Sequence, residues 1–236
     1  MRKIIIYFFI FSFIFTVLLG AKANGQQTIF NVPTPDVLDR GKVYVELDAS
    51  LKANDADALG KFSSFVPRIV VGVGKKIEVG LNLTGNIQPG ADSTTVVPTI
   101  KWKFYERETL SLFAGTHIYI PVRHRSYNIG CYSYAAVSRS IGKSRLTAGG
   151  FIASKNVFTQ NAVRGGGQFG FEHAVNSHVT FAADWITGRH ASGYFTPGVI
   201  YKPHAKVTTY LSYSIGNDNA VGGNQFFLLE VGYNFN

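Results

Sequence analysis

Apolar and polar residues alternate along most of the chain, most clearly in residues 224–236, NQFFLLEVGYNFN. Counting by twos from Phe227 gives an apolar face that ends at Phe235, while Glu230 and Asn234 lie on the opposite face. Successive side chains of a β-strand point to its two faces in turn. The pattern therefore predicts a strand with one apolar face and one mixed face.

The same alternation divides the rest of the chain into further segments, each near the length of a tilted transmembrane strand, about 9–11 residues. About twelve strands are predicted, at 42–52, 64–75, 77–87, 94–107, 110–122, 128–141, 144–157, 163–175, 178–188, 193–204, 205–216 and 224–235. Tight turns follow the even-numbered segments, and mostly longer loops follow the odd-numbered ones. This arrangement is typical of outer-membrane barrels. We therefore predict an all-β fold, an antiparallel up-and-down transmembrane β-barrel of about twelve strands.

Charged residues within the predicted strands avoid the apolar face. A charge on the lipid face of a barrel costs about 2–4 kcal/mol at the bilayer midplane, and an aqueous lumen avoids that cost. A soluble β-sandwich would instead turn its charged face outward. We expect a lumen charge network made of Glu46, Asp48, Arg68, Lys101, Lys103, Arg139, Arg145, Glu172, Asp184, Lys202 and Glu230.

The start of the chain has the organisation of an export signal. Arg2 and Lys3 precede an apolar run over residues 4–19, and small residues at Ala21 and Ala23 suit a signal peptidase. The run is short for a membrane-spanning helix of about 20 residues. We expect a cleavable signal peptide at residues 1–23 and a location in the outer membrane.

Residues 24–41 form an N-terminal segment ahead of the predicted barrel, residues 42–236. This segment is too short for a folded plug domain, and Pro33 and Pro35 favour an extended backbone. It can lie in the periplasm or enter the lumen, and the sequence leaves both alternatives open.

Composition adds little specific chemistry. The chain has one cysteine, which excludes an internal disulfide framework, and its six histidines show no metal-ligand spacing. The GVG sequence at residues 72–74 lacks the third glycine and the following helix of a nucleotide-binding loop. We therefore expect no cofactor, no metal site and no catalytic residues.

The predicted barrel and its export signal imply several partners. Outer-membrane lipids, small solutes and the barrel assembly machinery are expected, whereas export argues against nucleic acid despite the net charge of +9. Arginines in predicted outer loops suit lipid phosphates, because guanidinium binds phosphate in a bidentate way. The candidates for this contact are Arg123, Arg125 and Arg189.

Two stretches carry a resemblance to known families. The sequence VPRIVVGVGKKIEVGLNLTG, residues 66–85, loosely resembles the phenol-degradation-pathway (MetA-type) outer-membrane protein group. The last predicted strand resembles the aromatic C-terminal strand of bacterial outer-membrane proteins, with Phe235 in the penultimate position. The resemblance implies a twelve-stranded barrel and includes no substrate-binding motif.

We expect a monomeric, narrow diffusion channel for small solutes. Basic residues slightly outnumber acidic ones on the inward face, which favours a mild preference for anionic solutes. One alternative is a closed barrel that acts as a surface scaffold or binding protein. Another is an outer-membrane lipid or peptide hydrolase, since serine and histidine are both present.

Overall fold

The computed structural model describes residues 27–52, 62–84, 94–122, 128–158, 162–217 and 225–235. The strands are β1 (Val43–Leu51), β2 (Phe62–Gly74), β3 (Ile77–Thr84), β4 (Thr95–Arg107), β5 (Leu110–Pro121), β6 (Gly130–Ile141), β7 (Ser144–Ala153), β8 (Gly165–Ala174), β9 (Val179–Ile186), β10 (Tyr194–His204), β11 (Val207–Gly216) and β12 (Phe226–Phe235). All twelve lie close to the predicted ranges. The described residues contain no helix that is long and apolar enough to cross a membrane.

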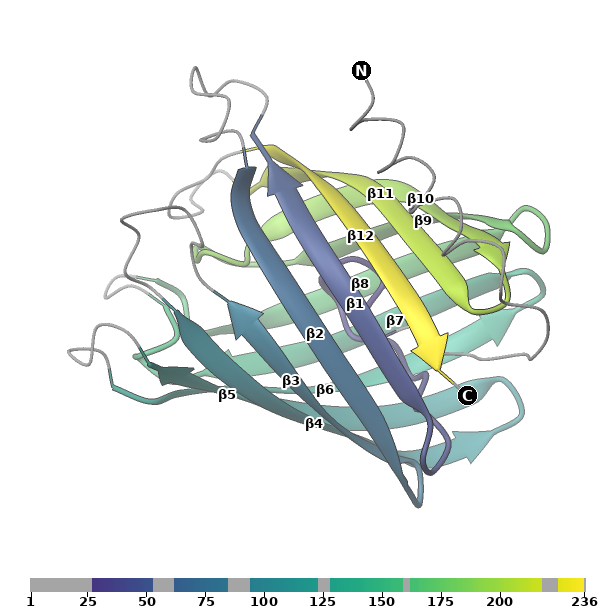
Figure 1. The fold of residues 1–236 in the computed structure, drawn as a ribbon, viewed down its shortest axis with the longest axis horizontal. Helices are drawn as coiled ribbons and strands as arrows, with labels where there is room; N and C mark the ends of the chain where they lie inside the picture. Colours follow the sequence, from purple (N-terminus) through teal and green to yellow (C-terminus); the bar gives the residue numbers. More distant parts are fainter. Residues whose placement is uncertain are drawn as a thin grey trace, which may run out of the picture.

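The twelve strands close into one barrel (Figure 1). Each strand pairs antiparallel with its sequence neighbours, and β1 also pairs with β12, from Val43 opposite Phe235 to Leu51 opposite Phe227. The sheet therefore has no free edge, which satisfies its backbone hydrogen bonds without water. The predicted all-β, antiparallel, up-and-down barrel is confirmed.

Short turns join the strands at one end of the barrel, at residues 75–76, 108–109, 142–143, 175–178 and 205–206. Lys75 and Lys76 both have positive φ, as a two-residue hairpin turn of type I′ requires. The connections at the other end are longer, at residues 52–61, 85–94, 122–129, 154–164, 187–193 and 217–225. We call these the short-turn end and the long-loop end.

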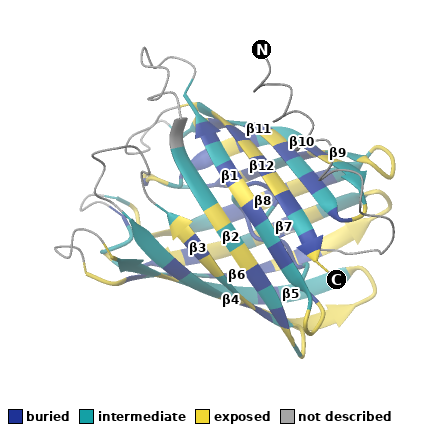
Figure 2. Cartoon of the chain, in the orientation of Figure 1, coloured by how far each residue is buried: buried dark blue, intermediate teal, exposed yellow. Residues whose placement is uncertain are grey.

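The two faces of the barrel differ as the alternation predicts (Figure 2). Large apolar side chains on the outer face are exposed, such as Leu47 at 48%, Ile100 at 47% and Leu229 at 45%. Charged side chains on the inner face are buried, such as Lys101 at 5% and Glu230 at 1%. An outer belt of exposed apolar residues suits contact with lipid.

Arg139 does not follow the predicted pattern. Its neighbours Ser138 and Ala136 are buried on the inner face of β6, whereas Arg139 and Val137 are exposed on the outer face. The expectation that Arg139 lines the lumen is therefore wrong. The inner face of β6 also carries two tyrosines, so neither face of this strand is distinctly apolar. The alternation therefore does not tell which residues of β6 face the lumen. Arg139 lies two residues from the end of β6, where a long side chain can reach the polar interface.

The loss of stability caused by a charged side chain on the outer face should depend on how deep that residue lies in the bilayer. We expect Leu229→Arg, near the middle of β12, to lower the free energy of unfolding by about 2–4 kcal/mol, because guanidinium would enter the hydrocarbon region. Ile141→Arg, at the last residue of β6, should cost about 0–1 kcal/mol. Urea unfolding from lipid vesicles measures both values. Equal losses at the two positions would contradict an outer face in contact with lipid.

Candidate functional site in the barrel lumen

Residues 27–38 run inside the barrel, and we call them the lumen segment. Figure 1 shows them as a purple trace within the ring of strands. Ile29, Val32 and Thr34 are fully buried, and Phe30 is 3% exposed. The chain turns tightly here, with the amide of Ile29 donating to the carbonyl of Val32 at 2.8 Å. Of the two alternatives open from the sequence, the structure shows the second, a segment within the lumen.

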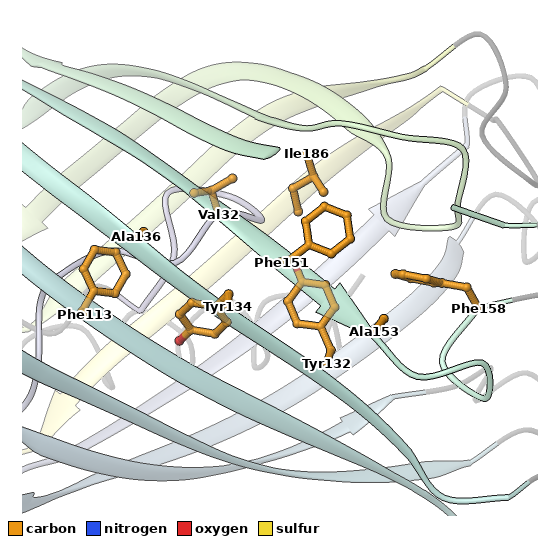
Figure 3. Packing of buried hydrophobic residues seen from close by; sticks show 9 residues of the cluster. All are labelled: Val32, Phe113, Tyr132, Tyr134, Ala136, Phe151, Ala153, Phe158 and Ile186. Carbon is orange, nitrogen blue, oxygen red and sulfur yellow. The ribbon is translucent and has the colours of Figure 1, made fainter. Parts of the chain in front are cut away.

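Apolar side chains of the lumen segment pack against opposite walls of the barrel. Ile29 and Phe30 join a cluster with Ala182, Ile200, Tyr210 and Leu228, on β9 to β12. Val32 joins a second cluster that contains residues of β5, β6, β7 and β9 (Figure 3). Burial of each such side chain contributes about 1.5–3 kcal/mol. The lumen segment is thus part of the packed interior.

Two inward-facing glycines make room for these side chains. A Cβ atom at Gly170 would overlap the Cδ1 atom of Ile29, and one at Gly198 would lie 2.7 Å from the Cζ atom of Phe30. Larger residues at these positions would push the lumen segment away from β8 and β10. The two glycines are therefore sockets for the segment in the barrel wall.

Asp184 on β9 holds the turn of the lumen segment. Its Oδ2 atom accepts hydrogen bonds from the backbone amides of Phe30 at 3.0 Å, Asn31 at 2.5 Å and Val32 at 2.8 Å. The Asn31 side chain also donates to Thr196 at 3.0 Å. Charge-assisted bonds of this kind are stronger than neutral ones. A carboxylate predicted only to line the lumen is therefore an anchor for the chain's own backbone.

A second anchor lies on β3 and β4, where Glu78 and Lys101 are register partners. Their ion pair measures 2.8 Å, and both side chains are buried. Glu78 Oε2 also accepts from the amide of Leu38 at 3.0 Å and from the side chain of Gln27 at 3.2 Å. Lys101 thus lies where predicted, paired to a carboxylate that holds both ends of the lumen segment.

The third anchor is Arg145 on β7. Its guanidinium contacts Glu172 at 2.5 and 2.8 Å and Asp36 of the lumen segment at 2.8 Å. Burial raises the pKa of Asp36, but the Arg145 charge and hydrogen bond outweigh burial and hold the pKa below its usual value. Asp36 is therefore ionised throughout the neutral range, and this contact weakens only when the pH falls to the lowered pKa.

A fourth group joins β1, β2 and β12. Arg68 contacts Glu46 at 2.7 Å and Asp48 at 3.2 Å, and its Nη1 atom lies 3.5 Å from Thr28 Oγ1 of the lumen segment. Glu230 belongs to the same group, with carboxylate oxygens of Glu46, Asp48 and Glu230 all within 4.8 Å of one another. The predicted residues of these three strands thus converge.

The remaining predicted residues lie nearer the two ends of the barrel. Lys103 contacts Glu106 at 2.6 Å near the short-turn end, and Lys202 lines a cavity at the same end. Arg189 lies in the connection after β9, beside a groove of about 550 Å³ on the outer face that is also lined by Trp185 and Phe195. Arg123 and Arg125 lie outside the described residues.

Cavities lie on both sides of the lumen segment. One of about 280 Å³, the long-loop cavity, is lined by Asp48, Arg68, Tyr132 and Glu230 among others. Another of about 320 Å³ lies at the short-turn end beside Arg145. A third, smaller cavity of about 40 Å³ lies between the segment and β2 to β6, lined in part by Arg68, Glu78, Lys101 and His117. The segment therefore lies within the lumen between the cavities of the two ends.

No family model and no curated protein matches this chain. Among solved structures, the KdgM porin in complex with disordered oligogalacturonate is 9% identical with a TM-score of 0.59, covering 82% of this chain and 99% of that chain. An outer membrane channel from Pseudomonas putida F1 is 13% identical with a TM-score of 0.50, covering 84% and 97%. Outer membrane phospholipase A from Escherichia coli is 12% identical with a TM-score of 0.50, covering 85% and 94%. The chain thus shares the fold of outer-membrane β-barrels, a fold that carries both channels and an enzyme.

Removing the charge of Asp184 should loosen the turn of the lumen segment. We expect Asp184→Asn to cost about 1–3 kcal/mol of local stability, because three backbone amides lose a charged acceptor. Hydrogen exchange at Phe30, Asn31 and Val32 should then be several times faster. Glu106→Gln, at the exposed pair with Lys103, should leave these rates unchanged. Unchanged exchange in Asp184→Asn would show that the charge of Asp184 is not needed to hold this turn.

Proposed function

We propose that this protein is a narrow diffusion channel for small solutes in the outer membrane, with its bore set by the lumen segment. The observation that carries this proposal is the position of residues 27–38, which lie between two cavities that open toward opposite ends of the barrel. Porins and a channel among the structures of the same fold support it.

The size of the barrel agrees with this proposal. Eight strands leave an interior that side chains fill, and sixteen leave an aqueous channel. Twelve strands lie between these cases, and here the lumen segment takes up much of the remaining space. The passage of about 40 Å³ has room for only a few water molecules. Larger solutes would pass only when the lumen segment shifts.

The expected preference for anionic solutes cannot rest on a count of charged residues on the inner face. With Arg139 on the outer face, basic residues no longer outnumber acidic ones within the strands. The narrow passage, however, has two basic residues in its lining, Arg68 and Lys101, against one carboxylate, Glu78. Charges at a constriction act more strongly than charges elsewhere in a pore. We therefore place the mild preference for anionic solutes at this passage.

The other expectations complete the proposal. Residues 1–23 would direct export, residues 24–41 would enter the lumen after cleavage, and residues 42–236 would be inserted by the barrel assembly machinery. The likeness of residues 66–85 to the phenol-degradation-pathway (MetA-type) group stays a hypothesis about relatives.

Each alternative has one observation in its favour. The three anchors of the lumen segment favour a closed barrel that acts as a scaffold. For a hydrolase, Ser144 Oγ and His173 Nδ1 lie 2.9 Å apart. A catalytic triad, however, joins serine to Nε2 and uses Nδ1 for an orienting carboxylate. The described residues place no carboxylate or amide in hydrogen-bond contact with His173, so the channel is the better proposal.

Planar-bilayer recording tests the channel. We expect small single-channel currents from the intact protein and currents larger by about twofold or more after deletion of residues 27–38, since twelve strands alone leave a wider lumen. Recordings in asymmetric salt should give a reversal potential whose sign indicates a preference for anions over cations.

Length-preserving variants provide the control. Gly170→Val should displace Ile29 and raise the current, whereas Gly150→Val, on the lipid face, should not. Heat-dependent mobility on gels shows whether each variant is folded. Folded, inserted protein that passes no current with or without residues 27–38 would end the channel proposal and favour the scaffold.

Arg189 supplies a test of lipid contact. The groove beside it combines apolar side chains with one guanidinium, which suits an anionic lipid. We expect Arg189→Glu to reduce the anionic lipid that co-purifies with the barrel by about half or more, because charge attraction becomes repulsion. Mass spectrometry of the extracted lipid measures the change. An equal reduction in Arg164→Glu, at the long-loop end outside this groove, would argue against a specific contact.

A further inference from the structure

The cluster of Glu46, Asp48 and Glu230 carries more negative charge than its surroundings balance. Asp48 and Glu230 are register partners on β1 and β12, so two carboxylates lie directly opposite each other. Like charges in such a pair destabilise a sheet. All three residues are buried, Glu230 to 1% exposure. Buried carboxylates require compensation by a cation or by hydrogen bonds.

The protein itself supplies part of that compensation. Arg68 contacts Glu46 and Asp48, and the Tyr44 hydroxyl donates to Glu46 Oε2. Neither oxygen of Glu230 has a hydrogen-bond partner among the described residues, and neither does Asp48 Oδ1. When all three carboxylates are ionised, one guanidinium beside them leaves two negative charges. Unpartnered oxygens thus point into the cluster from two strands.

We propose that Glu46, Asp48 and Glu230 bind a divalent cation of the size of Ca²⁺. Two oxygen ligands of one Ca²⁺ lie at most about 4.8 Å apart, because each bond is about 2.4 Å long. The three carboxylates each offer an oxygen within 4.8 Å of the others. Mg²⁺ requires near-ideal octahedral geometry and loses its waters reluctantly, so a cluster of carboxylates suits Ca²⁺ better. A charge of +2 matches the excess of the cluster.

Access and coordination number also suit this ion. Asp48 and Glu230 line the long-loop cavity, so an ion can enter from that side, and water from the cavity can complete the six to eight ligands that Ca²⁺ takes. Glu46 can serve Arg68 and the ion together, since a carboxylate has about four lone-pair sites.

A bound ion would also act on conduction, and this consequence alone rests on the proposed channel function. A bound ion of charge +2 would cancel the excess negative charge of the cluster, which lies beside the narrow passage at Arg68. The preference for anions should then be greater with Ca²⁺ than after its removal.

Calorimetric titration of the detergent-solubilised, chelator-treated protein with Ca²⁺ tests the site without any current measurement. We expect one site, with a dissociation constant of about 0.1–1 mM and weaker binding of Mg²⁺. Glu230→Gln and Asp48→Asn should each weaken Ca²⁺ binding by about tenfold or more. Glu172→Gln removes a lumen carboxylate that faces Arg145 instead and should leave binding unchanged.

Two results would overturn the cation site. One is folded wild-type protein that takes up no Ca²⁺ below about 10 mM, well above the expected range. The other is unchanged binding in both Glu230→Gln and Asp48→Asn. Binding without current would keep the site and remove only the channel, and current without binding would do the reverse.

Discussion

Closure of the sheet is the constraint on which the rest of this structure depends. In hydrocarbon every backbone amide and carbonyl needs a partner within the protein, so β12 pairs with β1 along its whole length. Once the ring is closed, each strand has one face toward lipid and one toward the lumen. Every later feature, from the apolar belt to the buried charges, follows from that division.

Closure also creates a lumen that twelve strands cannot fill with side chains alone. The lumen segment occupies it, held by apolar packing of the type that stabilises any core and by polar anchors at Asp184, Glu78 and Arg145. Several charged side chains of the inner face therefore hold the chain's own lumen segment in place. The carboxylates around Arg68 are different, because this arginine contacts only two of the three, Glu46 and Asp48, and this difference underlies the proposed cation site.

The sequence alone determined the strands, the alternation of short and long connections, and the face on which most charges lie. These features are local, since a period of two and a turn of two residues can be recognised within about ten positions. The sequence-based prediction failed at β6, where tyrosines on the inner face hid which residues face the lumen. Arg139 was therefore assigned to the wrong face. The prediction also gave no sign of the proposed cation site, because histidine and cysteine spacing cannot reveal carboxylates that come together from separate strands.

Only the tertiary structure decided where residues 27–38 lie and which charges meet. The amide of Phe30 reaches Asp184 across 154 positions of sequence, and Arg145 reaches Asp36 across 109. Such contacts depend on how the closed barrel brings opposite walls together, and no short pattern records that geometry. The packing of Ile29 against Gly170 and of Phe30 against Gly198 could not be predicted for the same reason. A glycine in a strand shows that space is left beside the backbone, but the fold determines which side chain fills that space.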